Sequence, residues 1–341
     1  MKKDHLRYLA CPRCQAGLSI RDADRADGPC VESGVLDCGG CHAAFPIVRS
    51  VPRFVPSASY ARSFSLEWLK HARTQYDSHS GAPISETRFF AETRWPRRLV
   101  GETILEVGSG SGRFTEQAAS TGAMVVSIDY SDAVEANAAA NGAKPNVLVV
   151  QADIYHLPVR PASCDRVVCI GVLQHTPDPE RAFTCLPPTV KPGGSLVVDV
   201  YRKVPGPRGC LMVKYWVRPV TRRIAPETLY RWCQRYVTWM WPVTGAVGRV
   251  PYVGKRLVLL GLLVADYRGI FPLPEEVLKE WAVLDTFDTL SPAYDQPQTP
   301  EAVARWFRQA GFAEDEFEVG PGYNGIEGRG IRPLATPGSA D

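Results

Sequence analysis

The sequence lacks a hydrophobic run long enough to span a membrane. The apolar run Leu257–Ala265 has nine residues, whereas a membrane-spanning helix needs about 20. The first seven residues also lack the apolar segment of a secretory signal. We therefore expect a cytoplasmic location, where the ten cysteines of the chain stay reduced.

The sequence also has little net charge, +3 over 341 residues, and its hydrophobic content of 45% is ordinary for a globular protein. The charge is unevenly distributed, however. Residues 202–256 contain twelve Lys or Arg and one acid, Glu227, so this segment has a net charge of +11. Because the whole chain carries only +3, the other residues together carry −8.

The glycine-rich segment Ile104–Phe114 is the most informative motif. It predicts a short buried strand, a glycine loop and the start of a helix, with Glu106 two residues before the first glycine. An acid at this position favours a nucleoside cofactor that carries an ammonium group. A dinucleotide loop prefers Gly-x-Gly-x-x-Gly, whereas Gly112 comes one residue too early for that pattern. The alternatives are a Rossmann-like domain that binds NAD, or one whose glycines serve only packing.

Further apolar segments predict the other strands of a parallel sheet. They alternate with helical segments, Thr115–Ser120 and Pro179–Leu186 among them, which predicts a sheet covered on both faces. The expected strands are Met124–Ile128, Val147–Val150, Asp165–Gly171 and Ser195–Val200. Asp129 follows the first of these, where an acid binds ribose hydroxyls in doubly wound folds. Asp153 follows the second beside Ile154, where an acid can accept the amino group of an adenine and its apolar neighbour can pack on the ring.

The order of these motifs, continued by Val172–His175 and Lys191–Gly194, resembles that of class I methyltransferases of the type 11 group, which use S-adenosylmethionine (SAM). The resemblance covers about Leu99–Tyr201, with a weaker return near Thr299–Ile331. It implies an α/β fold with a Rossmann-like, seven-stranded sheet. By motif position it assigns the methionine part of SAM to Glu106, Gly108, Gly110 and Gly112, the ribose to Asp129, the adenine to Tyr130, Asp153 and Ile154, and the sulfonium to Gly171.

A second motif lies near the N-terminus. Cys11 and Cys14 form one Cys-x-x-Cys pair, and Cys38 and Cys41 form another after 23 intervening residues. Four thiolates in two such pairs suit a closed, structural, tetrahedral Zn²⁺ site. A pair of redox disulfides and an accidental pattern are the alternatives. The segment resembles the small zinc ribbon that activates other methyltransferases as a separate subunit, here fused to its enzyme, and we expect the metal to let it fold.

The basic segment after the fifth strand is rich in aromatic residues. Leu229, Trp232, Cys233, Tyr236, Val237 and Met240 follow helical spacing and predict one apolar face, which Pro242 ends. A cap over the active site, a surface that meets anionic lipid or a lipid-linked acceptor, and a nucleic-acid site are the three interpretations. Some ribosomal RNA methyltransferases also carry a zinc ribbon. The modest overall charge and the long apolar cap place RNA second.

Three further regions border the expected pocket. The segment before the glycine loop resembles one that closes over SAM, which makes Tyr60, Gln75, Tyr76 and Arg88 candidate pocket residues. Trp281–Asp295 is predicted to be a loop whose Asp285, Asp288, Tyr294 and Asp295 either line the acceptor pocket or fix the loop. Thr299 caps a helix, and the last strands are expected at Phe312–Val319 and Asn324–Arg332, with Tyr323 and Asn324 near the pocket mouth.

These observations predict a zinc ribbon over residues 1–56 and a methyltransferase domain over 57–335. Within that domain we expect an N-terminal helical segment over 57–100 and a helical cap over 201–297, and after it a disordered tail over 336–341. The expected activity is in-line methyl transfer from SAM to a small-molecule, natural-product or lipid-linked acceptor. His175 is the candidate base, with a structural hydrogen bond as the alternative role. An RNA base methyltransferase and a non-catalytic SAM-binding partner protein are the alternative functions.

Overall fold

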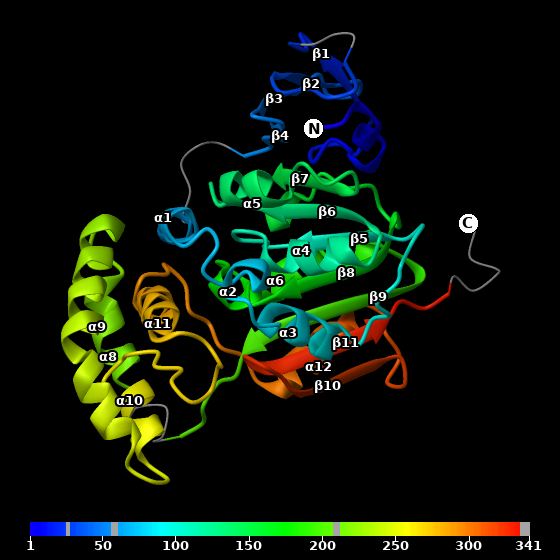
Figure 1. The fold of residues 1–341 in the computed structure, drawn as a ribbon. Helices are drawn as coiled ribbons and strands as arrows, with labels where there is room; N and C mark the ends of the chain where they lie inside the picture. The colour runs from blue at the N-terminus through cyan, green and yellow to red at the C-terminus, as the bar shows by residue number, and fades with distance from the viewer. Residues whose placement is uncertain (25–27, 56–60, 207–211, 335–341) are drawn as a thin grey trace.

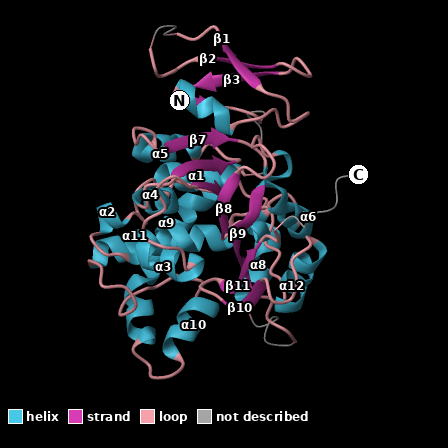
Figure 2. Cartoon of the chain, turned by 90° about the vertical axis from the view of Figure 1, so that its right-hand side faces the viewer, coloured by secondary structure: helices cyan, strands magenta, loops and turns pink. Residues whose placement is uncertain are grey.

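A computed structural model describes residues 1–24, 28–55, 61–206 and 212–334. Figures 1 and 2 show a small sheet stacked on the edge of a larger one. The small sheet is antiparallel and follows chain order. Its strands are β1 (Leu18–Arg21), β2 (Gly34–Cys38), β3 (Ala44–Val48) and β4 (Val51–Pro52), preceded by a short 3-10 helix at Lys3–Tyr8.

The larger sheet has seven strands in the order β10-β11-β9-β8-β5-β6-β7, and it confirms the predicted fold class. Its parallel strands are β5 (Thr103–Val107), β6 (Met124–Asp129), β7 (Val147–Gln151), β8 (Cys164–Ile170) and β9 (Val190–Tyr201). The last strand, β11 (Gly325–Ile331), lies antiparallel between β9 and β10 (Phe317–Pro321). β10 begins at Phe317 and not at Phe312, because Phe312 turns inward and packs against Phe307.

Helices cover both faces of this sheet, as the alternation of segments predicts. One face packs against α3 (Ile84–Thr93), α4 (Arg113–Ser120) and α5 (Val134–Asn141). The other packs against α6 (Pro179–Thr184) and α12 (Pro300–Gln309). Successive residues of a buried strand alternate between these layers: Ile104 packs with the first group and Leu105 with the second.

The ribbon and the larger sheet share one apolar core. Leu9 pairs with Val159, and Arg53 pairs in parallel with Gln151 at the edge of β7. The backbone N–H of Phe54 also donates to the carbonyl oxygen of Gln151 over 2.8 Å. β7 is the outermost strand of its sheet, so the ribbon covers an edge that would otherwise face solvent. The predicted boundary at residue 56 and the predicted tail at 336–341 lie outside the described residues.

A helical cap stands against the carboxyl ends of the parallel strands. It consists of α8 (Val213–Thr221), α9 (Pro226–Gly248), α10 (Gly254–Leu260) and α11 (Glu275–Leu290), joined by α1 (Arg62–Lys70). The short α2 (Asp77–Ser80) packs against α3 instead. α9 lies at the outer edge, with α11 between it and the sheet (Figure 1). No helix in the described part of the chain combines the length and apolar character that a bilayer crossing requires.

The cap corrects three predictions. Trp281–Asp295 is not a loop: most of it belongs to α11, because Trp281, Leu284 and Phe287 recur at helical spacing on its buried side. Pro242 does not end its helix, since α9 continues to Gly248 with the proline on the exposed side. Trp232 is not on the buried face of α9, because 53% of it is exposed.

Candidate functional site

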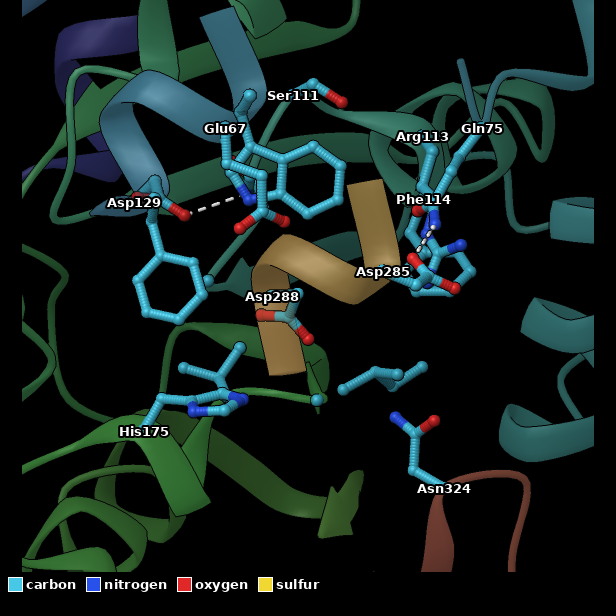
Figure 3. Close-up of a pocket in the computed structure, with 18 of the residues that line it drawn as sticks. Glu67, Gln75, Ser111, Arg113, Phe114, Asp129, His175, Asp285, Asp288 and Asn324 are labelled. Atoms are coloured by element: carbon cyan, nitrogen blue, oxygen red, sulfur yellow. Dashed lines mark hydrogen bonds between the residues drawn. The ribbon is translucent and has the colours of Figure 1, made fainter. Parts of the chain in front are cut away.

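A cavity of about 330 Å³ lies between the carboxyl ends of the parallel strands and helices α1 and α11. Its floor is the glycine loop after β5 together with the ends of β6 and β8. α1 supplies Phe64, Glu67 and Trp68, and α11 supplies Trp281, Asp285 and Asp288. Figure 3 shows Asp129 on one side of this cavity and Gln75, Arg113 and Asp285 gathered on the other.

The glycine loop is left-handed at all three of its glycines. Gly108, Gly110 and Gly112 have φ angles of 82°, 53° and 97°. A Cβ at Gly108 would lie 2.1 Å from a methyl group of Val172, and one at Gly112 would lie 2.2 Å from Oδ1 of Asn137. Close packing therefore requires glycine at both positions, and this leaves Gly108 and Gly110 to line the cavity with their backbones.

Asp129 ties the end of β6 to the glycine loop. Its Oδ2 accepts a hydrogen bond from the N–H of Gly110 over 2.8 Å, and its Oδ1 accepts from the N–H and hydroxyl of Ser131. Burial raises the pKa of Asp129 above its ordinary value, while these hydrogen bonds favour the ionised form. A carboxylate with lone pairs still free can accept hydroxyl groups from a ligand in the cavity.

Glu106 is buried behind the loop and does not line the cavity. Thr115 and Ser127 donate to its Oε2 over 2.5 and 2.9 Å, whereas its Oε1 is buried without a hydrogen-bond partner among the described residues. Burial raises its pKa to about 7. An acceptor that lacks a donor is a costly feature in a protein interior, so this oxygen fits a site that a cationic ligand completes.

The remaining predicted cofactor residues divide into two groups. Tyr130, Ile154 and Gly171 line the cavity. Asp153 does not line it: its side chain caps the turn at Ile154–His156 by accepting from the N–H of Tyr155. Gly112 lies outside the lining as well.

Two arginines form the positive part of the wall. Arg88 donates to Glu92 over 2.7 Å, and its Nη2, 3.8 Å from Asp199, has no hydrogen-bond partner in the described part of the chain. Burial lowers the pKa of Arg113 to about 10, within the range where it remains charged at neutral pH. The sequence identified Arg88 but not Arg113 as a pocket residue. Arg113 lies inside the glycine motif, and only the glycines and Glu106 of that motif were given a role.

Three carboxylates form the negative part. Burial and the neighbouring Asp285 and Asp288 raise the pKa of Glu67 well above its ordinary value. Burial likewise raises the pKa of Asp285 to about 6, although Tyr267 and Gln75 donate to it. Glu67 was missed from the sequence, since a single acid on a mixed helix gives no signal until the helix is placed. Of the other segment residues, Gln75 lines the cavity, Tyr76 supports the loop by donating to the carbonyl of Ser111, and Tyr60 is outside the described residues.

His175 lies just beyond β8, at the wall opposite α11. Its Nδ1 is 3.0 Å from the carbonyl oxygen of Tyr294, and its ring meets Phe64 and Tyr201 edge-on. A carbonyl oxygen only accepts, so Nδ1 carries the proton and the neutral ring keeps a lone pair on Nε2. That is the tautomer a general base needs.

A second cavity of about 360 Å³ adjoins the first. Both are lined by His175, Tyr201, Ala265, Asp288, Thr289, Tyr323 and Asn324. α8 adds Lys214 and Arg218, which lie 3.0 and 3.6 Å from Oδ2 of Asp295. Oδ1 of Asp295 is buried and has no hydrogen-bond partner among the described residues. Tyr294 contributes its backbone carbonyl to the site.

The four predicted metal ligands converge. Their Sγ atoms all lie within 4.8 Å of one another, and the contacts of 3.6 Å (Cys11 to Cys41) and 3.4 Å (Cys14 to Cys38) cross between the two pairs. A tetrahedral zinc site with Zn–S bonds of about 2.3 Å separates its sulfurs by about 3.8 Å. The N–H groups of Gly40 and Cys41 donate to Cys38 Sγ, and a Cβ at Gly40 would lie 3.2 Å from Cys14 Sγ. The residues present therefore fit the metal.

Comparison with known families matches two segments of the chain. Residues 105–198 match the model of the methyltransferase domain, and residues 2–50 match that of the Trm112p-like protein. The first segment contains the glycine loop and the ends of the strands that line the cavity. The second contains the four cysteines.

Individual relatives align with a smaller part of the chain. The ubiquinone biosynthesis O-methyltransferases of Xanthomonas euvesicatoria and Pseudomonas paraeruginosa are 32% and 33% identical over 110 residues, which is 31% of this chain. The matching region spans a little under half of those relatives, 46% and 47%. A solved chain from a complex of the Haloferax volcanii Trm112 methyltransferase activator is 12% identical, with a TM-score of 0.43 over 80% of this chain and 99% of that one. One chain therefore carries a segment similar to the Trm112p-like protein, followed by a segment similar to the methyltransferase domain.

Proposed function

We propose that this protein transfers a methyl group from SAM to a hydroxyl group of a small molecule. The observation that carries the proposal is the cavity between the strand ends, where the glycine loop, Asp129 and His175 meet within a matched methyltransferase domain. The relatives named above are O-methyltransferases, which supports oxygen as the accepting atom.

SAM fits this cavity by its distribution of charge. We assign its ribose hydroxyls to Asp129 and its adenine to Tyr130 and Ile154, which line one side. Its carboxylate pairs with Arg88 and Arg113, and Glu106 balances its ammonium group from behind the loop. Asp153 remains a weaker assignment, because its carboxylate caps a turn outside the lining.

The cofactor supplies an activated methyl group, so the protein chiefly aligns the reactants and excludes water. With SAM bound, its methyl group would be open to in-line transfer to the acceptor oxygen. The free Nε2 of His175 takes the hydroxyl proton. His175 lines both cavities, so an acceptor held in the second cavity reaches the base and the cofactor cavity together.

The lining favours a small acceptor over RNA. Asp285 and Asp288 give one side of the first cavity acidic groups, which suit a sulfonium and repel a polyphosphate chain. The second cavity is mixed: Lys214 and Arg218 neutralise Asp295, and Met212 and Leu263 add apolar surface. A hydroxylated, partly apolar molecule matches the lining of this cavity.

We assign a structural Zn²⁺ to Cys11, Cys14, Cys38 and Cys41. The metal holds the two turns of the ribbon together, and four sulfur ligands leave no position for a reacting water. Its contribution is therefore to folding.

The test is transfer of label from methyl-labelled SAM to hydroxylated small molecules, lipid extracts and RNA, offered separately to the full chain. We expect labelled small-molecule or lipid products that a His175→Ala variant forms more slowly. Label in RNA alone would overturn the acceptor class. If neither SAM nor its demethylated product binds by calorimetry, the assignment of SAM as the cofactor is overturned. Binding without any methyl transfer would identify a non-catalytic SAM-binding protein.

A further inference from the structure

The outer side of the cap exposes large hydrophobic residues at an unusual density. Trp216 and Trp239 are each 73% exposed, and Tyr252 is 98% exposed. We define the cap face by these side chains and their exposed neighbours on α8, α9 and α10 and in the connections that follow α8 and α9. Its apolar members are Trp216, Val220, Trp232, Trp239, Val243, Val250, Tyr252, Val253 and Leu257.

On α9 these residues form one stripe. Trp232, Arg235, Trp239 and Val243 are exposed and recur every three or four residues, so they lie along one side of the helix. The opposite side is buried and packs against α11, which lies between α9 and the sheet (Figure 1). Trp232 and Trp239 therefore point away from the buried side of α9 and from α11.

The same face is strongly cationic. Its exposed cations are Arg222, Arg223, Arg231, Arg235 and Arg256, and none of them forms an ion pair with a carboxylate in the described part of the chain. The single acid of residues 202–256, Glu227, pairs with Arg62 from α1 over 2.9 Å. The cap face thus combines uncompensated positive charge with exposed tryptophan and aliphatic side chains.

From this combination we infer that the cap face docks onto the surface of an anionic lipid bilayer. Tryptophan rings insert at the level of the headgroups, valine and leucine reach the acyl boundary, and each Lys or Arg gains energy beside anionic lipid. The inference does not depend on the proposed reaction. It predicts association with the membrane surface, not insertion across it.

Charge excludes a second copy as the occupant, because a self-association would bring two strongly positive faces together. Nucleic acid fits less well than lipid. Single strands bind in grooves whose aromatic rings stack with bases, whereas this face lies on the outer edge of the molecule and includes aliphatic residues that bases do not need (Figure 1). A flat, anionic and partly apolar surface matches it better.

Docking would also place the membrane beside the second cavity. Tyr215 of α8 is 36% exposed and also lines that cavity, as do Lys214 and Arg218 on the same helix. The first turn of α8 therefore separates the cap face from the cavity that we assign to the acceptor. A lipid-borne molecule would have a short path between the two.

The experiment is co-sedimentation of the full chain with phosphatidylcholine vesicles that contain or lack phosphatidylglycerol. We expect binding only with the anionic lipid, weakening as salt rises. The double variants Trp232→Ala/Trp239→Ala and Arg231→Gln/Arg235→Gln should each reduce the partition coefficient at least about tenfold. Both pairs lie on the exposed side of α9, so their melting temperatures should stay close to that of the unsubstituted chain.

The matched control is Arg98→Gln/Val100→Ala, which alters one exposed cation and one exposed aliphatic residue outside the cap. This variant should bind vesicles like the unsubstituted chain. Equal binding to neutral vesicles, or unchanged binding by both cap variants, would overturn the inference. Tighter binding to RNA than to vesicles, or a dimer that the cap variants dissociate, would assign the face to those occupants and overturn it too.

Discussion

The Nδ1 atom of His175 lies 3.0 Å from the backbone oxygen of Tyr294, a residue 119 positions later in the chain. The segment around Tyr294 is fastened to the His175 loop at further points. The side-chain amide of Gln296 donates to the carbonyl oxygens of Thr176 and Pro177. The backbone N–H of Gln296 donates to the carbonyl oxygen of Gln174. The connection that follows α11 therefore sets the orientation and the tautomer of the proposed base.

His175→Ala should lower kcat by about 10² to 10⁴, the usual contribution of a general base. SAM affinity should change little, because His175 has no assigned contact to the cofactor. Turnover with an identified acceptor and calorimetric titration of SAM measure the two effects separately. His79→Ala is the control, since His79 is exposed and lines neither cavity. Unaltered turnover in His175→Ala would remove the residue as the base.

Asp129→Ala should weaken SAM binding at least about tenfold, since hydrogen bonds to a charged group contribute about 1.5–3 kcal/mol. The substitution also releases the N–H of Gly110, which Asp129 holds in place. Isothermal titration calorimetry provides the dissociation constant. Asp315→Ala, at an exposed acid far along the chain, should bind SAM normally. Full affinity in Asp129→Ala would contradict the ribose assignment.

SAM binding should depend on pH through Glu106, whose pKa burial raises from 4.5 to about 7. Below that value the free protein holds a proton that the ammonium group of SAM must displace. Affinity should therefore rise with pH, by up to about tenfold per unit below pH 7, and level off above it. Calorimetry in buffers of different ionisation enthalpy would detect the released proton. Glu106→Gln should abolish both the proton release and the pH dependence of SAM affinity. A pH dependence retained in this variant would show that another group causes it.

The same group should affect stability without SAM, in the opposite direction. A carboxyl whose folded pKa is raised stabilises the fold below its unfolded pKa, and this contribution is lost as pH rises through the folded pKa. For Glu106 the window runs from 4.5 to about 7. Relative to Glu106→Gln, the melting temperature of the unsubstituted chain should fall across this window. A constant difference between the two would show that Glu106 does not titrate there.

Purified protein should contain one zinc per chain by elemental analysis, and Cys14→Ser should lose it. We expect the melting temperature to fall by at least about 5 °C, because metal binding in such ribbons is folding energy. Cys30→Ser is the control: Cys30 is also exposed, but it lies outside the cluster. A chain that lacks zinc and melts like the zinc-bound protein would refute the structural role.

The parts predicted well were those with a local pattern. The strand–loop–helix motif at Ile104–Phe114 and the paired cysteines have fixed spacings, so the sheet and the four-sulfur cluster could be anticipated. The cap was harder. In α11 the buried side carries Leu284 and Phe287 while Asp285 and Asp288 face the cavity, and this mixture resembles a polar loop until the neighbouring helices are known.

The missed parts of the site depend on tertiary placement. Glu67 becomes a pocket residue only because α1 folds over the glycine loop, and no spacing in the sequence indicates that contact. Trp232 fitted the apolar periodicity of α9 and yet faces outward. Periodicity can place a residue at the edge of the apolar face of a helix. It does not show whether a residue at that edge is buried or exposed.

The pairing of Arg53 with Gln151 at the edge of β7 has one more consequence. The ribbon and β7 belong to the same polypeptide. The fraction of molecules in which they are paired therefore depends on an effective local concentration and not on the abundance of a second subunit. Dilution, which separates two-chain assemblies by mass action, will leave this strand edge protected.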